Sequence, residues 1–152
     1  MKRTTYIYTI IVLAIAGVIA SCGKDLRVYN GPNQVEFSPI VKSRSQGTVA
    51  VPGYDSVKVQ VIGAQLSSAQ TLSYNIDASS TAVAGTHYSI PNSGTFTLPA
   101  NSSFGYIRIN LVPGSIASSA TTSQKTLVLN LTGNSALPAS PNYSKYTLTI
   151  TF

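Results

Sequence analysis

The chain has 152 residues, with ten Lys or Arg against four Asp or Glu, one His, one Cys and no Trp. One histidine excludes a cluster of histidine metal ligands, and one cysteine excludes an internal disulfide. The basic residues are spread along the chain without a run, so the sequence predicts no clustered basic face for a nucleic acid.

The first 21 residues have the pattern of an export signal. Lys2 and Arg3 supply a positive start, and residues 6–20 form an uncharged, largely apolar run of 15 residues. This run is shorter than the roughly 20 residues that span a bilayer, which favours a signal peptide over a membrane helix. The run closes on Ile19-Ala20-Ser21-Cys22, which resembles the bacterial lipobox.

The lipobox resemblance implies cleavage between Ser21 and Cys22 and a lipid on the Cys22 sulfur, which would attach the protein to a membrane. An exported domain with one thiol has no disulfide partner, which supports this interpretation. An ordinary secreted protein with a chance cysteine, or a buried thiol, is the alternative. Gly23-Lys24-Asp25 resembles the Lys-plus-acid signals of Bacteroidetes surface lipoproteins. We therefore expect an outer-membrane lipoprotein on the cell surface rather than on the periplasmic face.

The mature chain is long enough for one domain. Removal of 21 of the 152 residues would leave 131, with eight basic and four acidic residues. That length supports a single hydrophobic core. Residues 22–33 are predicted to be the lipidated cysteine and a tether, which ends at the turn signal YNGP of residues 29–32, and residues 34–152 are predicted to be the domain.

Apolar and polar residues alternate with period two in eight short segments, which is the pattern of half-buried strands. The segments are residues 34–38, 46–51, 55–64, 71–77, 93–98, 104–112, 125–132 and 143–152. The side chains predicted to face inward are Val35, Phe37, Val57, Val59, Val61, Leu72, Tyr74, Ile76, Phe96, Leu98, Ile107, Ile109, Leu111, Leu127, Leu129, Leu131, Tyr146, Leu148, Ile150 and Phe152. No segment after the signal has helical periodicity. The predicted fold is therefore all-β, an immunoglobulin-like antiparallel sandwich of two sheets with seven or eight strands.

Residues 77–88 (DASSTAVAGTHY) resemble the Calx-β pattern, in which a Thr-Ala and a spacer precede Gly-Thr-Asp-Tyr. The resemblance continues through GTFTLPAN at residues 94–101, the strand at 106–111 and KTLVLNL at 125–131. Residues 29–37 (YNGPNQVEF) resemble the opening of Bacteroidetes lipoproteins of the DUF4843 type, which carry such a domain after a lipobox. Together these segments imply a Calx-β-like sandwich in a cell-envelope lipoprotein.

The calcium-binding members of the Calx-β family use carboxylates at three places where this chain has none. The first place is His87, the second is the turn at 112–115 (VPGS) and the third is the polar segment 118–124. Ca²⁺ requires six to eight oxygen ligands, several of them carboxylates. We expect no calcium, no other metal and no cofactor.

The reactive side chains favour a non-enzyme. His87 is interpreted as a polar loop residue beside a buried Tyr88. Glu36 is predicted to face outward on an edge strand, and Asp77 to bond its own backbone at the start of a loop. A carboxylate pair for glycoside hydrolysis would have to come from Glu36, Asp55 and Asp77, and nothing in the sequence brings two of them to one cleft.

Three tyrosines remain as candidates for ligand stacking: Tyr54, Tyr106 and Tyr143, whereas Tyr74, Tyr88 and Tyr146 alternate with the core set. Two functions follow. One is a structural or protein-interaction module at the envelope that offers strand edges or loops to an unknown protein. The alternative is a surface glycan-binding accessory protein of a polysaccharide uptake system, which would need at least two of the three tyrosines exposed and coplanar on one patch. Exposed tyrosines on a sheet also serve simply as cross-strand packing.

Overall fold

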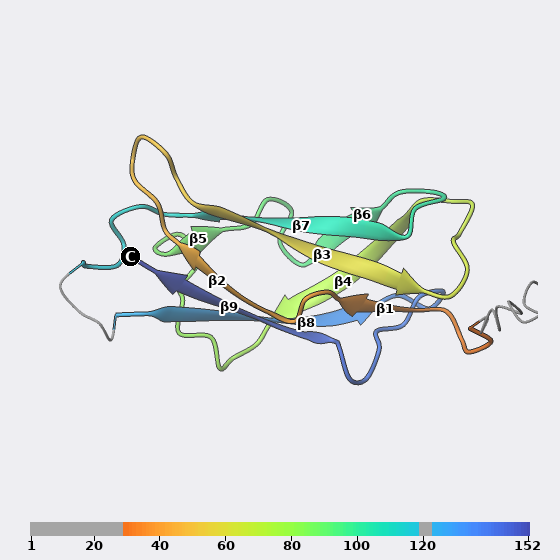
Figure 1. Ribbon diagram of the computed structural model, residues 1–152. Coiled ribbons are helices and arrows are strands. Elements are labelled where there is room, and N and C mark those ends of the chain that lie inside the picture. The colour runs from red at the N-terminus through yellow and green to blue at the C-terminus, as the bar shows by residue number, and fades with distance from the viewer. Residues whose placement is uncertain (1–28, 119–122) are drawn as a thin grey trace, which may run out of the picture.

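A computed structural model describes residues 29–118 and 123–152 (Figure 1). The predicted signal peptide, its cleavage site at Ser21 and the predicted lipidation site at Cys22 lie outside the described residues. The strands are β1 (Gln34–Phe37), β2 (Val41–Ser45), β3 (Tyr54–Ile62), β4 (Gln70–Ile76), β5 (Tyr88–Ser89), β6 (Thr95–Leu98), β7 (Phe104–Leu111), β8 (Lys125–Gly133) and β9 (Lys145–Thr151). Within these residues no helix is long and apolar enough to cross a membrane.

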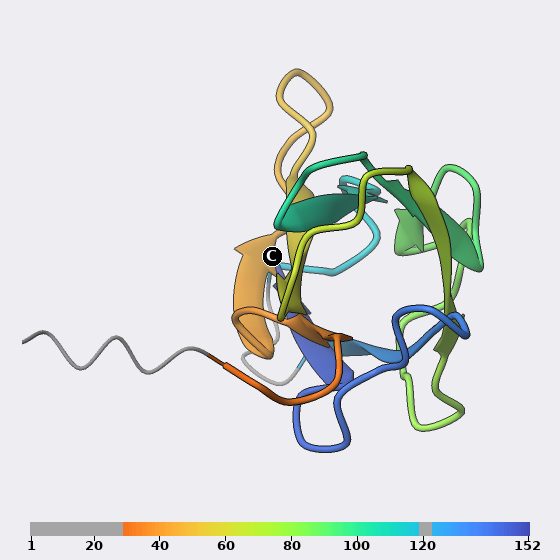
Figure 2. The same ribbon diagram turned by 90° about the vertical axis from the view of Figure 1, so that its right-hand side faces the viewer.

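The strands form two sheets that face each other, as the sequence predicted. The four-stranded sheet has the order β1-β3-β7-β5, and the five-stranded sheet has the order β2-β9-β8-β4-β6. Every pair of neighbours is antiparallel except β2 and β9, which run parallel. Seen along the strands, the two sheets curve around a shared interior (Figure 2).

The core lies between the sheets and is built by the predicted alternation. Val57 and Val59 of β3 are fully buried, as are Leu127 and Leu129 of β8 and Leu148 of β9. Because successive side chains of a strand point to opposite faces, the strands that line the interior contribute alternate residues to it, whereas β2 has no buried residue. The buried set forms one continuous cluster that draws on both sheets.

The second strand lies earlier than predicted. The prediction of a strand at residues 46–51 is wrong, because the strand is Val41–Ser45 and residues 46–53 form the turn to β3. Gly47 has a φ of 76°, a conformation that suits glycine, and the amide of Thr48 donates to the carbonyl of Val51. The alternating valines that suggested a strand are therefore exposed on a hairpin, with Val49 88% exposed.

Two residues predicted to face inward are exposed because their neighbouring strands end. Phe152 is 65% exposed, since the pairing of β9 with β8 begins only at Ile150 opposite Lys125. Ile76 is the last residue of β4, three residues beyond the last residue of β4 that pairs with β6, and is also exposed. A further difference is β5, a two-residue strand paired with β7 in a segment predicted to be a loop.

The β2–β3 hairpin and the N-terminal entry lie at opposite ends of the sandwich. Figure 1 shows the chain entering β1 at one end, while the turn between β2 and β3 projects from the other. At the hairpin end of β3, no strand among the described residues lies beside residues 54–57 on the β1 side, because β1 pairs only with Val59–Ile62. The side chains of β2 approach β3 at this place.

Candidate binding face

Alternate residues of β3 and β7 form the outer face of the four-stranded sheet. The register sets Tyr54 opposite Asn110, Ser56 opposite Arg108, Lys58 opposite Tyr106 and Gln60 opposite Phe104. We call Tyr54, Lys58, Phe104, Tyr106 and Arg108 the aromatic face. Tyr54 is 53% exposed and Tyr106 is 54% exposed, and Phe104 is exposed beside them. The alternation of residues 104–112, with Ile107, Ile109 and Leu111 inward, predicts that Tyr106 and Arg108 face outward, and both are exposed.

Cations and rings alternate on the aromatic face. The guanidinium of Arg108 lies 3.8 Å from the centre of the Tyr54 ring, and Lys58 Nζ lies 5.3 Å from the centre of the Phe104 ring. The rings of Phe104 and Tyr106 meet edge to face, with centres 5.7 Å apart and an interplanar angle of 66°. Cation–π pairs at exposed sites contribute about 0.5–1 kcal/mol each, and they hold the charged groups close to the sheet.

Tyr143 is exposed but lies elsewhere. Its carbonyl accepts a hydrogen bond of 2.9 Å from the amide of Phe37, so its backbone runs along the outer edge of β1. Two strand spacings, roughly 10 Å, separate the Tyr143 backbone from β3. The structure therefore brings two of the three predicted tyrosines, Tyr54 and Tyr106, to one face of the sheet, and places Tyr143 away from them.

A buried ion cluster lies directly behind the aromatic face. Asp55 is 1% exposed and points into the sandwich. Its Oδ1 accepts hydrogen bonds from Lys42 Nζ at 3.3 Å and Arg44 Nε at 3.1 Å, and its Oδ2 accepts one from the Tyr146 hydroxyl at 2.5 Å. Lys42 Nζ also donates to the carbonyl of Ser56 at 3.0 Å. The cluster joins β2, β3 and β9 across the corner between the two sheets.

The cluster perturbs both of its acidic groups. Burial alone would raise the pKa of Asp55, but the hydrogen bonds from Tyr146 and Arg44 and the charge of Lys42 outweigh it, so the pKa is lowered from 3.8. The pKa of Tyr146 is raised by burial, by its hydrogen bond to Asp55 and by the Asp55 charge. The carboxylate therefore stays ionised inside the fold, and the phenol stays protonated as its donor.

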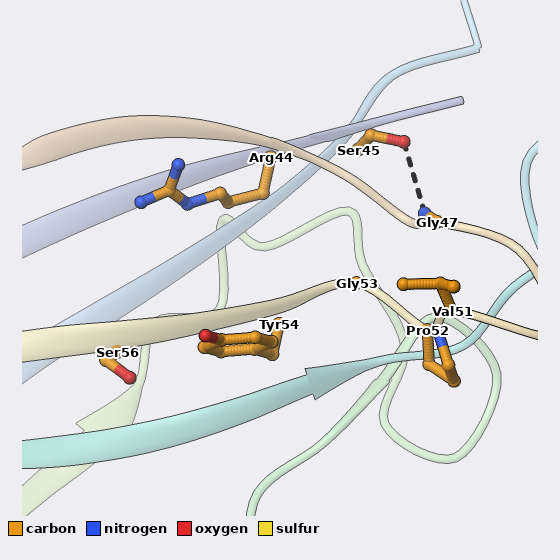
Figure 3. A pocket seen from close by; sticks show the side chains of 8 residues that line it. All are labelled: Arg44, Ser45, Gly47, Val51, Pro52, Gly53, Tyr54 and Ser56. Carbon is orange, nitrogen blue, oxygen red and sulfur yellow. Dashed lines mark hydrogen bonds between the residues drawn. The ribbon is translucent and has the colours of Figure 1, made fainter.

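A pocket of about 630 Å³ opens between β2 and β3, beside the cluster (Figure 3). Arg44 projects from β2 on one side, and Tyr54 and Ser56 line the other side on β3. Val51 and Pro52 of the hairpin close one end. The pocket thus combines a guanidinium, a hydroxyl, an aromatic ring and a small apolar wall, and Tyr54 belongs to both the pocket and the aromatic face.

Asp77 has a structural role at the start of the β4–β5 loop. Its Oδ1 accepts the amide of Ser79 at 2.9 Å, which confirms the predicted local turn. Its Oδ2 accepts Asn130 Nδ2 at 2.8 Å and pairs with Lys145 Nζ at 3.1 Å. Hydrogen bonds to Ser79, Asn130 and Lys145 hold the pKa of Asp77 well below its usual range.

His87 and Glu36 also bond to groups of their own neighbourhood. His87 is buried, and its Nδ1 accepts the amide of Val83 at 2.9 Å, so the ring fastens its own loop beside Tyr88, which is buried as predicted. Glu36 lies on the edge strand β1, as predicted, and its Oε1 accepts Gln60 Nε2 at 2.7 Å. Glu36, Asp55 and Asp77 therefore belong to three separate places in the fold.

Across residues 29–118 and 123–152, no group of three or more His, Cys, Asp or Glu side chains is placed to hold a metal ion. The turn at residues 112–115 has no carboxylate, and Ser115 instead bonds the buried Gln46 side chain at 3.0 Å. Part of the third Calx-β position, residues 119–122, lies outside the described residues.

Two of the features above were not predicted from the sequence. The Asp55 cluster was missed although Asp55 has the same alternation as the inward Val57 and Val59, which is the signal that could have revealed it. Gln46, fully buried, donates to the carbonyl of Ile116 at 2.8 Å and accepts from the Ile116 amide at 2.9 Å. No sequence pattern links two residues that are 70 positions apart.

The topology and the loops define a Calx-β-like sandwich. The "Apo-form Calx CBD1 domain" superposes with a TM-score of 0.58 at 16% identity, covering 79% of this chain and 96% of that one. The "calcium binding domain CBD12 of CALX1.1" gives 0.58 and 16%, covering 78% of this chain and 45% of that one. A "putative carbohydrate binding protein" from Bacteroides ovatus ATCC 8483 gives 0.56 and 10%, covering 78% of this chain and 36% of that one.

These likenesses establish the fold. The chain spans nearly all of the Calx CBD1 structure but less than half of the other two. The names of the second and third structures refer to calcium binding and to putative carbohydrate binding, respectively. No protein-family model matches the chain, and no curated protein matches it.

Proposed function

We propose that this chain is a non-catalytic binding module of the cell envelope that docks a protein partner through the aromatic face. The observation that carries the proposal is the exposed set of Tyr54, Phe104, Tyr106 and Arg108 on two adjacent, rigid strands. Tyrosine, phenylalanine and arginine are enriched in protein interfaces, and Tyr and Arg are among the residues that dominate binding energy there. A face of this composition on paired strands suits contact with another folded surface.

The proposal includes an outer-membrane anchor. A lipid on Cys22 after cleavage at Ser21 would hold the chain, since two or three acyl chains at about 0.8 kcal/mol per buried methylene bind almost permanently. The lipobox, the resemblance to DUF4843-type Bacteroidetes lipoproteins and the Lys24-Asp25 pair support this location on the cell surface. The tether enters at the end of the sandwich opposite the β2–β3 hairpin, so the hairpin end would point away from the membrane (Figure 1).

An absence of catalysis is supported by the way the carboxylates are used. Asp55 is held by three donors, Asp77 by an amide, an asparagine and a lysine, and Glu36 by a glutamine. None of these groups lies free in a cleft beside a second acid or a nucleophile in the part of the chain that the structure describes.

A glycan-binding accessory protein is the second candidate. Two observations favour it, namely the shared face of Tyr54 and Tyr106 and the likeness in fold to the carbohydrate-binding candidate from Bacteroides ovatus. Against it, the Arg108 guanidinium already lies over the Tyr54 ring at 3.8 Å, and the Phe104 and Tyr106 rings meet edge to face. The face thus offers less bare ring surface for a sugar than the number of aromatic residues suggests.

Site-specific photo-crosslinking tests the proposal. A benzophenone amino acid at Tyr106, in the full chain in its native envelope, should give one discrete protein adduct. The same group at Thr97, which is exposed on the outer face of the other sheet, should give none. Equal labelling at both positions would contradict docking through this face. Binding to host or bacterial glycans that is lost in Tyr106→Ala, without a protein adduct, would instead establish the second candidate.

A further inference from the structure

We infer that the pocket beside the hairpin binds an acidic, extended segment of the protein partner, which adds as a short strand to the open edge of β3 and places a carboxylate on Arg44. The inference rests on the proposed function and names the chemistry of the partner. Three observations carry it: an unpaired stretch of backbone, an excess of positive charge and a pocket of suitable shape.

The open edge comprises backbone groups of Tyr54 and Ser56. The amide of Leu111 donates to the carbonyl of Gly53, so Gly53 and Leu111 form a hydrogen-bonded pair. In an antiparallel ladder such pairs alternate with pairs whose N–H and C=O groups point away from the neighbour. Tyr54 and Ser56 therefore direct their backbone groups away from β7, toward the side where β1 does not reach.

Two bonds verify this direction. The carbonyl of Ser56 accepts Lys42 Nζ at 3.0 Å, and the carbonyl of Lys58 accepts the amide of Ser38 at 3.1 Å. Both partners lie on the side away from β7. The N–H and C=O of Tyr54 and the N–H of Ser56 thus face the pocket, where no strand pairs with them. An extended peptide can bind such an edge through its main chain.

The pocket also has an excess positive charge. Lys42 and Arg44 both pair with the single carboxylate of Asp55. The Arg44 side chain is 49% exposed and the Lys42 side chain 19% exposed, so the surplus charge faces the pocket from Arg44. Arg44 uses Nε for Asp55, and its two terminal amino groups donate to no residue that the structure describes. They form the fork that binds a carboxylate in two places.

Further cations extend this charge beyond the pocket. The Arg108 side chain lies over Tyr54, and its backbone is opposite Ser56 in the register; Lys58 is two residues beyond Ser56 along β3, roughly 7 Å. Neither pairs with a carboxylate among the described residues. The rise of an extended peptide also brings alternate side chains about 7 Å apart, so acidic residues at alternate positions of one peptide match these cations.

The main-chain groups favour a peptide over an acidic glycan. A uronic acid could use Arg44 and the tyrosine rings, but it has no regular series of N–H and C=O groups for the β3 edge. Val51 and Pro52 add an apolar wall against which a small apolar side chain of the segment can pack.

The test uses the full chain in mild non-ionic detergent, at 50 mM salt, with synthetic probes. The acetylated and amidated peptide (Asp-Val)4 should bind, whereas (Lys-Val)4 and a fully N-methylated (Asp-Val)4 should not. The N-methylated probe keeps the charge and loses the main-chain donors. Equal binding of the methylated and unmethylated acidic peptides would overturn strand addition.

Protein variants test the same contacts from the other side. Arg44→Gln should weaken binding of (Asp-Val)4 at least tenfold. Lys125→Gln is the control, because it removes the same charge from β8 rather than from β2, and it should weaken binding less than twofold. Ser56→Pro removes the edge N–H and should weaken binding at least tenfold, whereas Ser56→Ala keeps the N–H and should change it less than twofold. If Ser56→Pro does not fold, the N-methylated peptide tests the same hydrogen bonds.

The outcomes separate this inference from the proposed function. A crosslinked protein at Tyr106 together with no binding of (Asp-Val)4 would overturn the acidic segment and leave the docking face standing. Polygalacturonate is the probe for an acidic glycan. If it binds more tightly than (Asp-Val)4, and if its binding is lost in Arg44→Gln but not in Ser56→Pro, the ligand is an acidic glycan and the peptide inference is overturned. If Arg44→Gln and Lys125→Gln weaken binding of (Asp-Val)4 equally, the peptide is held only by long-range electrostatic attraction, and the site at Arg44 is overturned.

Discussion

The hydrogen bond from Tyr146 to Asp55 should account for a measurable part of the stability of this fold. Tyr146→Phe removes one hydroxyl and leaves the ring, so no cavity forms in the core. Lys42 and Arg44 both bind Oδ1 of Asp55, and among the described residues only Tyr146 donates to Oδ2. The substitution therefore leaves one oxygen of a buried, charged carboxylate without a donor.

The expected cost follows from the charge of the acceptor. A hydrogen bond to a charged group contributes about 1.5–3 kcal/mol, and an orphaned buried partner adds to the loss. We expect the free energy of unfolding to fall by about 2–3 kcal/mol, a large share of the roughly 5–15 kcal/mol of a typical domain. Urea unfolding at pH 7 of a soluble chain that begins at Gly23 would measure the loss.

Tyr74→Phe is the matched control, because it removes the same hydroxyl from the same residue type. Tyr74 is buried, and its hydroxyl has no hydrogen-bond partner among the described residues. Replacing it should change the free energy of unfolding by less than about 0.5 kcal/mol or increase it, since an unsatisfied buried polar group is costly. Equal losses in the two variants, or a loss below 0.5 kcal/mol in Tyr146→Phe, would refute the stabilising role of the cluster.

Four further predictions concern acid, lipid, metal and the C-terminus. The fold lowers the pKa of Asp55, so the ionised carboxylate contributes fully to the free energy of unfolding above about pH 3.8, and this contribution is lost as the pH falls through the lower pKa of the folded state. Acid should therefore reduce the midpoint of urea unfolding, and the reduction should be less steep in Tyr146→Phe. Cys22→Ala removes the attachment point of the lipid, so the variant should be found either as soluble protein or as uncleaved precursor. If the variant is cleaved and still remains in the membrane fraction, the anchor lies elsewhere. Millimolar Ca²⁺ should not shift the melting temperature, whereas a site filled at 100 times its Kd would add about 2.7 kcal/mol. Deleting residues 148–152 should unfold the domain, because it removes the buried Leu148 and Ile150, at about 1.5–3 kcal/mol each, together with most of the pairing of β9 with β2 and half of its pairing with β8. Phe152→Ser should change little, and similar melting temperatures for the two variants would show that the core does not depend on Leu148 and Ile150.

Local alternation was enough to predict the architecture. The inward valines of β3 and the aliphatic residues of β7 and β8 are buried as predicted, because a strand has only two faces and one of them meets the core. The same rule identified Tyr106 and Arg108 as outward residues. The alternation thus predicted the outward direction of two members of the aromatic face. Tyr54 precedes the predicted strand at 55–64, and the cation–π pairs depend on the register between two strands, so neither was predicted.

The errors share one cause, which is that neighbours in space are not neighbours in sequence. β2 was misplaced because none of its residues is buried and the side chains that it directs toward Asp55, Lys42 and Arg44, are charged, whereas Val49 and Val51 alternate like strand residues on an exposed turn. Phe152 continues the alternation of β9 but passes beyond the start of β8. The pocket depends on where β1 stops pairing with β3, which no local pattern encodes.

The parallel pairing of β2 with β9 has a consequence for the order of folding. Val41 lies beside Thr147 and Ser45 beside Thr151, so β2 can pair only when residues 147–151, about 100 positions later in the chain, are present. Closing a loop of this length has a high entropic cost before any contact compensates it, and topologies rich in such distant pairings fold in milliseconds to seconds. A chain shortened before Lys145 would lack β9 and would leave β2, with Lys42 and Arg44, without its pairing partner. The domain is therefore expected to fold only once residues 145–151 are available to pair with β2.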